Sequence, residues 1–405
     1  MEMSEGTPAG AQNRETVIGP VSLVTPEGVR PEMAVVLSGG KILAAEKASR
    51  FSRGELTVEQ PLYLSAGFID LHVHGGGGGD FMDATPGAFK TALSAHLSHG
   101  TTTLSPTTLT ATMEELAAVF QALEDFKKSP EAETLPETPG LHLEGPYVAP
   151  AMAGAQDPRY IRTPDDGSYR DILGMAKENL LIWTIAPELP GSGQMMEELQ
   201  KRGVHMSVGH SEAQYCHVKK AAEYGCRMAT HLYSSMSTLV RENGYRKLGI
   251  VESALLSDEM LVELIADGKH LPPELLRLVY KTKGPDKMLL VTDAMRGAGM
   301  PDGLYKLGSL SRGQEVMVSD GIARMPDGIS FAGSVATADR LIRVMVKEAK
   351  IPLHEAVSMM TVNPARAVGL DRRKGLVSPG LDADLVLFDE DIRIHGVYLR
   401  GRRVR

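Results

Sequence analysis

The chain has 405 residues, a formal net charge of −8 and an apolar fraction of 42%. Core growth usually stalls beyond roughly 250–300 residues, so this length predicts one large α/β domain with a smaller partner domain. The charged fraction of 23% excludes a disordered or fibrous chain. The mild acidity offers no basic surface for nucleic acid, so we expect no nucleic-acid partner.

The two cysteines, Cys216 and Cys226, are too few for a disulfide scaffold or a cysteine-rich zinc module, and they predict a reducing, cytoplasmic location. No segment reaches the roughly 18–20 apolar residues that span a bilayer, so we expect no membrane partner. Residues 1–15 lack the basic start and apolar run of a secretory signal. We expect them to form a disordered tail.

Short apolar runs separated by turn residues fill residues 16–64, and the same pattern returns over residues 366–405. Such runs are typical of β-strands and hairpins. Two strand-rich ends around a long middle predict one small β-sandwich domain assembled from both ends of the chain.

The middle of the chain, residues 65–365, alternates strand-like runs with segments whose apolar residues recur at helical spacing. Alternating strands and helices favour a parallel sheet, and eight strands predict a (β/α)8 barrel of the TIM type. Two further helices are predicted after the eighth strand, near residues 336–350 and 353–370. The eight predicted strands are 67–74, 101–107, 140–145, 181–188, 205–210, 228–233, 261–270 and 288–294.

Polar residues gather at or near the predicted carboxyl ends of six of these strands. In a barrel these ends converge on one face, where active sites are built. Buried imidazoles and carboxylates are costly without partners, so their shared placement indicates a common site. The residues are His72, His74, Glu144, His210, His231, His270 and Asp293.

The residue types point to a metal centre. His72 and His74 are two residues apart on a strand, so their side chains point to the same side and can bind one ion. Imidazole with carboxylate suits zinc, iron or another divalent transition metal, and Glu144 can bridge two ions. His210 and His231 can complete a second site.

Asp293 has two open roles: it can bind a metal or accept a proton from an activated water molecule. His270 can polarise a substrate carbonyl. A structural role is the simpler interpretation of His142 and of the other histidines. The run of residues 75–79 lacks the strand–GxGxxG–helix context of a nucleotide site and predicts a loop of close backbone approach. GxSxG, Walker A and HExxH motifs are absent, which excludes those hydrolase and nucleotide-binding classes.

Taken together, these motifs resemble the amidohydrolase superfamily, and within it the N-acetylglucosamine-6-phosphate deacetylase family. The resemblance covers nearly the whole predicted barrel, from about residue 65 to residue 389. The matching segments are SAGFIDLHVHGGGGGDFMDAT, GLHLEGPYVAPAMAGAQDPRYI, VGHSEA, ATHLYSSM, IADGKH, LLVTDA, FAGS, NPARAVGL and PGLDADLVLFD.

The resemblance implies roles for the polar residues. Glu144 takes the place of the carboxylated lysine of many superfamily relatives, and His210 and His231 join it around one ion. The intact His72–His74 pair can hold a second ion, although some relatives use one. Asp293 is implied as general base toward water and then general acid toward the leaving amine. His270 polarises the acetamide carbonyl, and zinc is the expected metal.

Substrate recognition departs from the family pattern. Gln156 stands where relatives have a sugar-contacting histidine. Ser234 and Ser235 replace the Asn-Ala pair that binds phosphate, and we expect their two N–H groups and two hydroxyls to hold an anion. The phosphate-binding arginine, which in relatives reaches in from the neighbouring subunit, corresponds to Arg241. Its segment is longer here and adds Arg246. These implications predict a homodimer.

We therefore expect a metal-dependent hydrolase that removes the acetyl group from N-acetylglucosamine-6-phosphate. One alternative is another N-acyl amine as substrate, such as the galacto isomer or an unphosphorylated amino sugar. A second alternative is a barrel that binds a sugar or a protein without catalysis. Against that alternative, the chain retains every predicted ligand and the acid–base residue.

Overall fold

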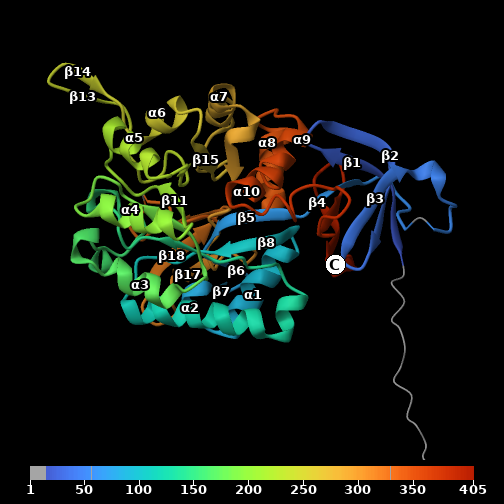
Figure 1. Ribbon diagram of the computed structural model, residues 1–405, viewed down its shortest axis with the longest axis horizontal. Coiled ribbons are helices and arrows are strands. Elements are labelled where there is room, and N and C mark those ends of the chain that lie inside the picture. Colours follow the sequence, from blue (N-terminus) through green and yellow to red (C-terminus); the bar gives the residue numbers. More distant parts are fainter. Residues whose placement is uncertain (1–14, 56, 329) are drawn as a thin grey trace, which may run out of the picture.

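The computed structural model describes residues 15–55, 57–328 and 330–405. The tail predicted for residues 1–15 therefore lies, apart from its last residue, outside the described part of the chain. Figure 1 shows a large body of strands and helices with a smaller sheet beside it, where the blue and red ends of the chain meet. None of the helices within the described residues has the length and hydropathy that crossing a bilayer requires.

The smaller domain is one seven-stranded sheet built from both ends of the chain, in the order β22-β21-β20-β4-β1-β2-β3. The sheet curls until edge strand β3 meets the segment before β20, where the Ile42 N–H donates to the Leu381 carbonyl at 3.0 Å. Its inner face encloses a separate apolar core that includes Ile18 and Leu64. This is the β domain expected from the two strand-rich ends. Its strands are β1 (Thr16–Thr25), β2 (Gly28–Ser38), β3 (Lys41–Lys47), β4 (Tyr63–Ala66), β20 (Leu385–Phe388), β21 (Ile394–Leu399) and β22 (Arg402–Arg403).

Eight parallel strands form the predicted barrel. Six of them make one sheet from β9 to β16, and β5 pairs with β8. Bridges between Thr107 and His142 and between Val73 and Ala294 join the two pieces into a closed ring. The strands are β5 (Phe68–Val73), β8 (Thr101–Pro106), β9 (Leu141–Glu144), β10 (Leu180–Ile185), β11 (His205–Val208), β12 (Met228–Ala229), β15 (Leu261–Leu264) and β16 (Met288–Leu290).

Amphipathic helices cover the barrel, and α2 shows how the sequence starts such a helix and buries one of its faces. The Thr112 hydroxyl accepts from the Glu115 N–H, and the Glu115 carboxylate accepts from the Thr112 N–H, which caps the helix start. Leu116, Phe120 and Leu123 lie on one helical face and are buried. The helices are α1 (Pro86–Leu97), α2 (Met113–Lys128), α3 (Tyr169–Ala176), α4 (Ser192–Lys201), α5 (Tyr215–Glu223), α6 (Ile250–Leu256), α7 (Pro273–Lys283), α8 (Ala338–Lys347), α9 (Leu353–Ser358) and α10 (Val362–Ala367).

The later barrel strands end earlier than the sequence predicts. His210, His231 and Asp293 have φ values of 47°, 29° and 48°, a left-handed backbone that ends an extended strand. His270 lies in a loop beyond β15, where the Asp267 carboxylate accepts the His270 N–H at 2.8 Å and forms a turn. These four side chains therefore extend from the loops that follow the strands. His72 and Glu144, by contrast, lie within β5 and β9.

Three small antiparallel sheets were not among the predicted elements. β6 (Gly75–Gly76) pairs with β7 (Gly79–Asp80), so the glycine run forms a tight hairpin. β13 (Val240–Glu242) and β14 (Tyr245–Lys247) form an exposed hairpin. β17 (Gly303–Leu307), β18 (Gln314–Ser319) and β19 (Ile322–Arg324) form a three-stranded sheet after β16. Leu307, at the end of β17, lines the pocket described next.

Candidate metal centre and active site

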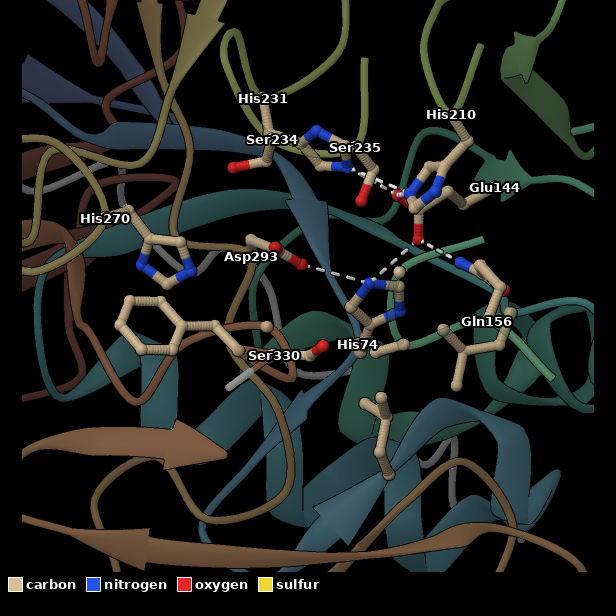
Figure 2. A pocket seen from close by; sticks show the side chains of 16 residues that line it. His74, Glu144, Gln156, His210, His231, Ser234, Ser235, His270, Asp293 and Ser330 are labelled. Atoms are coloured by element: carbon tan, nitrogen blue, oxygen red, sulfur yellow. Dashed lines mark hydrogen bonds and ion pairs between the residues drawn. The ribbon is translucent and has the colours of Figure 1, made fainter. Parts of the chain in front are cut away.

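One pocket at the mouth of the barrel, with a volume of about 320 Å³, collects most of the side chains predicted from the sequence. Figure 2 shows these side chains converging from several strand ends on one space. His72 lies behind the pocket wall and is fully buried. The predicted residues that line the pocket are His74, Glu144, Gln156, His210, His231, Ser234, Ser235, His270 and Asp293.

Glu144, at the end of β9, is the centre of the polar cluster and is 2% exposed. Its Oε1 lies 2.9 Å from His210 Nε2 and 2.8 Å from His231 Nε2, and the two imidazole nitrogens are 3.2 Å apart. His210 Nδ1 lies 2.8 Å from the Met152 carbonyl, which accepts its proton and leaves the lone pair on Nε2. The three side chains thus present ligand atoms to one point, as a metal site requires.

His72 and His74 approach the same cluster from β5. His74 Nε2 lies 3.3 Å from Glu144 Oε2 and 3.1 Å from Asp293 Oδ1. His72 Nε2 lies 3.5 Å from Glu144 Oε1 and 3.5 Å from Asp293 Oδ1. These two histidines with Glu144 form a second group whose ligand atoms are close enough for one ion. Glu144 belongs to both groups and is positioned to bridge them.

The residues present fit a divalent transition metal. His72 Nε2 and Asp293 Oδ1 are buried and have no hydrogen-bond partner within the described residues. Buried polar atoms are almost always paired, so two such atoms in one cluster fit the role of ligands to a cation. Four imidazoles with two carboxylates are also the ligand types that such metals prefer.

Electrostatics at the cluster favour a cation. Burial would lower the pKa of His74, but Asp293 and Glu144 outweigh it and raise that pKa to about 9. Burial would likewise raise the pKa of Glu144, but His72, His210 and His231 hold it well below its usual range. Without an ion, protons on the imidazoles balance the carboxylates, and a bound metal would take over this role because metal binding releases protons.

Asp293 follows β16, where this strand meets β5 and closes the barrel, and its side chain faces the cluster. Its N–H donates to the His72 carbonyl at 2.8 Å, and its carbonyl accepts from the Ser334 N–H at 2.7 Å. These bonds hold the residue in its left-handed conformation, which costs energy for a residue other than glycine. Burial would raise its pKa, but His72 and His74 lower it, so the Asp293 carboxylate is ionised at neutral pH.

His270 sits across the pocket from the histidine cluster (Figure 2). Its Nδ1 lies 3.0 Å from Asp267 Oδ2, and its ring packs edge-on against Phe331 at 4.9 Å between ring centres. Burial would raise the pKa of Asp267, but contact with His270 lowers it, so this carboxylate is an anionic acceptor. Because Asp267 contacts Nδ1, His270 Nε2 is the ring nitrogen available to a molecule in the pocket.

Sequence reasoning missed three buried acids that support the site. Glu263 Oε2 lies 3.2 Å from His72 Nδ1, and Asp267 holds His270. Asp70 Oδ2 accepts from the Thr292 hydroxyl at 2.6 Å, across the closure between β5 and β16. The available signal was an acidic residue inside an otherwise apolar strand, as in LVELIA and GFIDL. His142 is a core residue, as expected, bonded to the Leu71 carbonyl and to Thr184.

The predicted anion site is only partly available. The Ser234 N–H donates to the His231 carbonyl at 3.0 Å, so it is not free to hold a phosphate, contrary to the expectation of two N–H donors. This bond tightens the turn after β12. The hydroxyls of Ser234 and Ser235 make no hydrogen bond within the described part of the chain, and both side chains face the pocket.

The predicted phosphate-binding arginines lie elsewhere. Arg241 and Arg246 are paired across the β13–β14 hairpin and are exposed. Figure 1 shows this hairpin projecting from the barrel body. Among the described residues, no lysine or arginine lines the pocket. Within one copy of the chain, the structure therefore does not bring these arginines to the site.

A closed parallel barrel with histidines and carboxylates gathered at its strand ends is typical of metal-dependent hydrolases. Residues 63–404 match the family model described as Amidohydrolase family. The N-acetylglucosamine-6-phosphate deacetylase of Lysinibacillus sphaericus is 34% identical over 388 residues, which cover 95% of this chain and 97% of that protein. The N-acetylgalactosamine-6-phosphate deacetylase of Escherichia coli O157:H7 is 30% identical, covering 94% and 97%.

A solved mutant N-acetyl-D-glucosamine-6-phosphate deacetylase from Mycobacterium smegmatis, in complex with N-acetyl-D-glucosamine-6-phosphate, has a TM-score of 0.86 to this structure at 30% identity. The match covers 96% of this chain and 99% of that one. The chain belongs to the amidohydrolase family and, within it, to the N-acetylglucosamine-6-phosphate deacetylase family. It is an enzyme that hydrolyses amide bonds, which sets aside the alternative of a non-catalytic barrel.

Proposed function

We propose that this enzyme hydrolyses the acetamide of N-acetylglucosamine-6-phosphate to glucosamine-6-phosphate and acetate. The observation that carries the proposal is the convergence of Glu144, His210 and His231 on one point, with Asp293 and His270 facing it across the pocket. Relatives that carry this activity by name cover nearly the whole chain.

Glu144, His210 and His231 would hold a divalent metal, for which we propose zinc, and His72 with His74 would hold a second ion. When bound, the metal supplies a Lewis acid for the amide carbonyl and lowers the pKa of a water molecule to about 7. Glu144 Oε1 and the Nε2 atoms of His210 and His231 are the ligand atoms that face this position.

Asp293 and His270 carry out the proton transfer and the carbonyl polarisation in this proposal. The ionised Asp293 carboxylate accepts the proton of the attacking water as the new C–O bond forms. A His270 ring protonated on both nitrogens would donate from Nε2 to the carbonyl oxygen while its Nδ1–H donates to Asp267. Asp293 then returns the proton to the amine nitrogen as the C–N bond breaks. The products are the amine and acetic acid, which releases its own proton to become acetate.

Recognition of the 6-phosphate requires positive charge, and the described pocket lining of one chain contains no lysine or arginine. We propose that Arg241 or Arg246 of the exposed hairpin enters the pocket of a second copy and that the enzyme is a homodimer. The hydroxyls of Ser234 and Ser235 would complete the anion site. A cytoplasmic location is part of this proposal, and the free thiols of Cys216 and Cys226 support it.

An acetate-release assay on metal-loaded enzyme tests the substrate. N-Acetylglucosamine-6-phosphate, its galacto isomer and both unphosphorylated sugars are compared at equal concentration. We expect kcat/KM for the first to exceed that of the unphosphorylated sugar by at least about 100-fold, because desolvated charge pairs contribute several kcal/mol. Equal or higher kcat/KM for the galacto isomer would transfer the proposal to that sugar, for which a relative of 30% identity exists.

A further inference from the structure

The side chain of Gln156 contacts the proposed metal ligand Glu144. Gln156 Nε2 donates to Glu144 Oε2 at 2.6 Å, and the Gln156 side chain is buried, with 3% of the residue exposed. Figure 2 shows the amide directed at the carboxylate from the side opposite His231. A donor at this distance from an ionised carboxylate forms a strong, charge-assisted hydrogen bond.

A second bond fixes the orientation of the amide. Gln156 Oε1 accepts from the Thr110 N–H at 2.6 Å, in the loop that follows β8. A flipped amide would set its NH₂ group against the Thr110 N–H and its oxygen against the carboxylate, so both contacts would become repulsive. The amide oxygen therefore already accepts one hydrogen bond, and both ends of the amide have partners within the protein.

The two oxygens of Glu144 consequently have different partners. Oε1 lies within 2.9 Å of His210 and His231 and 3.5 Å from His72, whereas Oε2 is held by Gln156 and lies 3.3 Å from His74. Carboxylates that ligate metals depend on such outer hydrogen bonds for their orientation. The bond to Gln156 holds Oε1 toward the pair of histidines and competes with a second ion for Oε2.

We propose that Gln156 is a positioning residue that holds Glu144 for the ion shared with His210 and His231 and favours this ion over a second one at His72 and His74. This inference rests on the proposed metal site. In this inference the Gln156 side chain binds Glu144, whereas the family resemblance implies that the residue at this position contacts the sugar.

The test measures metal affinity by chelator competition with metal-free enzyme, which needs no substrate. In Gln156→Leu we expect the affinity for the first Zn²⁺ to fall about 10–100-fold. Gln314→Leu is the matched control, because Gln314 Nε2 donates to the Ala155 carbonyl at 2.6 Å and supports the same loop without touching Glu144. Its Zn²⁺ affinity should stay close to that of the wild type.

Gln156→Asn provides a second variant in case the leucine variant does not fold, since a side chain one methylene shorter cannot span Thr110 and Glu144. Unchanged affinity in the folded Gln156 variants, or an equal loss in Gln314→Leu, would overturn the inference. At saturating metal we expect KM for the sugar phosphate to change little. A large rise in KM with unchanged metal affinity would show instead that Gln156 contacts the sugar.

The inference and the proposed function can fail separately. If the wild-type enzyme binds Zn²⁺ but releases no acetate from N-acetylglucosamine-6-phosphate, the proposed substrate is wrong, and the chelator competition still tests Gln156. If the wild-type enzyme binds no divalent ion, both are overturned.

Discussion

Glu263 Oε2 lies 3.2 Å from His72 Nδ1, and the same oxygen lies 3.4 Å from the backbone nitrogen of His231. One fully buried carboxylate on β15 therefore contacts both halves of the metal cluster. It accepts the His72 Nδ1 proton and directs Nε2 of that ring at Glu144 and Asp293. The orientation of His72 thus depends on a residue that lines no part of the pocket.

Replacing Glu263 with glutamine tests this dependence. The amide keeps the size of the side chain but removes the negative charge that favours the Nδ1 proton, so we expect affinity for the ion at His72 and His74 to fall about tenfold or more. Metal titration followed by elemental analysis measures the loss. Glu259→Gln is the control, because Glu259 is exposed and pairs with Arg227. Equal metal binding in both variants would show that Glu263 does not orient His72.

Asp293→Asn tests the assignment of the acid–base group. The amide cannot take a proton from water, and we expect kcat to fall by about 10²–10⁴-fold. The ion at Glu144, His210 and His231 should remain, because Asp293 does not belong to that group of ligands. Acetate release and metal content, measured on the same preparation, check both statements. Full activity in this variant would reject the assignment.

The hairpin arginines are tested by subunit mixing. A chain carrying Arg241→Ala and Arg246→Ala should lose turnover of the phosphorylated sugar, because the pocket lining of one copy contains no lysine or arginine among the described residues. A chain carrying Asp293→Asn should also be inactive, because it lacks the proposed acid–base group but keeps both arginines. If the arginine comes from the second copy, mixed dimers contain one complete site, and partial activity returns. Two inactive chains that stay inactive after proven exchange would contradict this arrangement.

The ion pair between buried Asp339 and partly exposed His99 predicts pH-dependent stability. Burial would raise the pKa of Asp339, but His99, Thr337 and Arg343 lower it to about 2. Since this folded value lies below the usual 3.8, the pair stabilises the enzyme at pH 5, and the stabilisation is lost as the pH falls toward 2.

Urea unfolding of Asp339→Asn should show a loss of about 2 kcal/mol at pH 5 and a much smaller loss near pH 2. Asp391→Asn serves as control, because the ion pair of Asp391 with Lys347 is about half exposed. A loss for Asp339→Asn that does not change with pH would show that packing, and not charge, holds the pair.

The barrel and the convergence of most residues of the candidate metal centre were predictable because both depend on local pattern. Buried parallel strands produce continuous apolar runs, and a barrel gathers their carboxyl ends at one face, so the order of His72, Glu144, His210, His231 and Asp293 along the chain was enough to predict a shared site. The resemblance to known motifs added the roles of Asp293 and His270.

The supporting contacts could not be predicted from pattern alone. Gln156 and Glu144 are close in sequence, but the bond between them depends on a loop whose path is decided by Thr110, and Glu263 meets His72 across the closed barrel. The sequence by itself determined which strands carry ligands, because side-chain alternation and strand order are local properties. Only the tertiary structure decided which atom of each ligand is free, because hydrogen bonds between residues distant in the chain set the orientation of every ring and carboxylate.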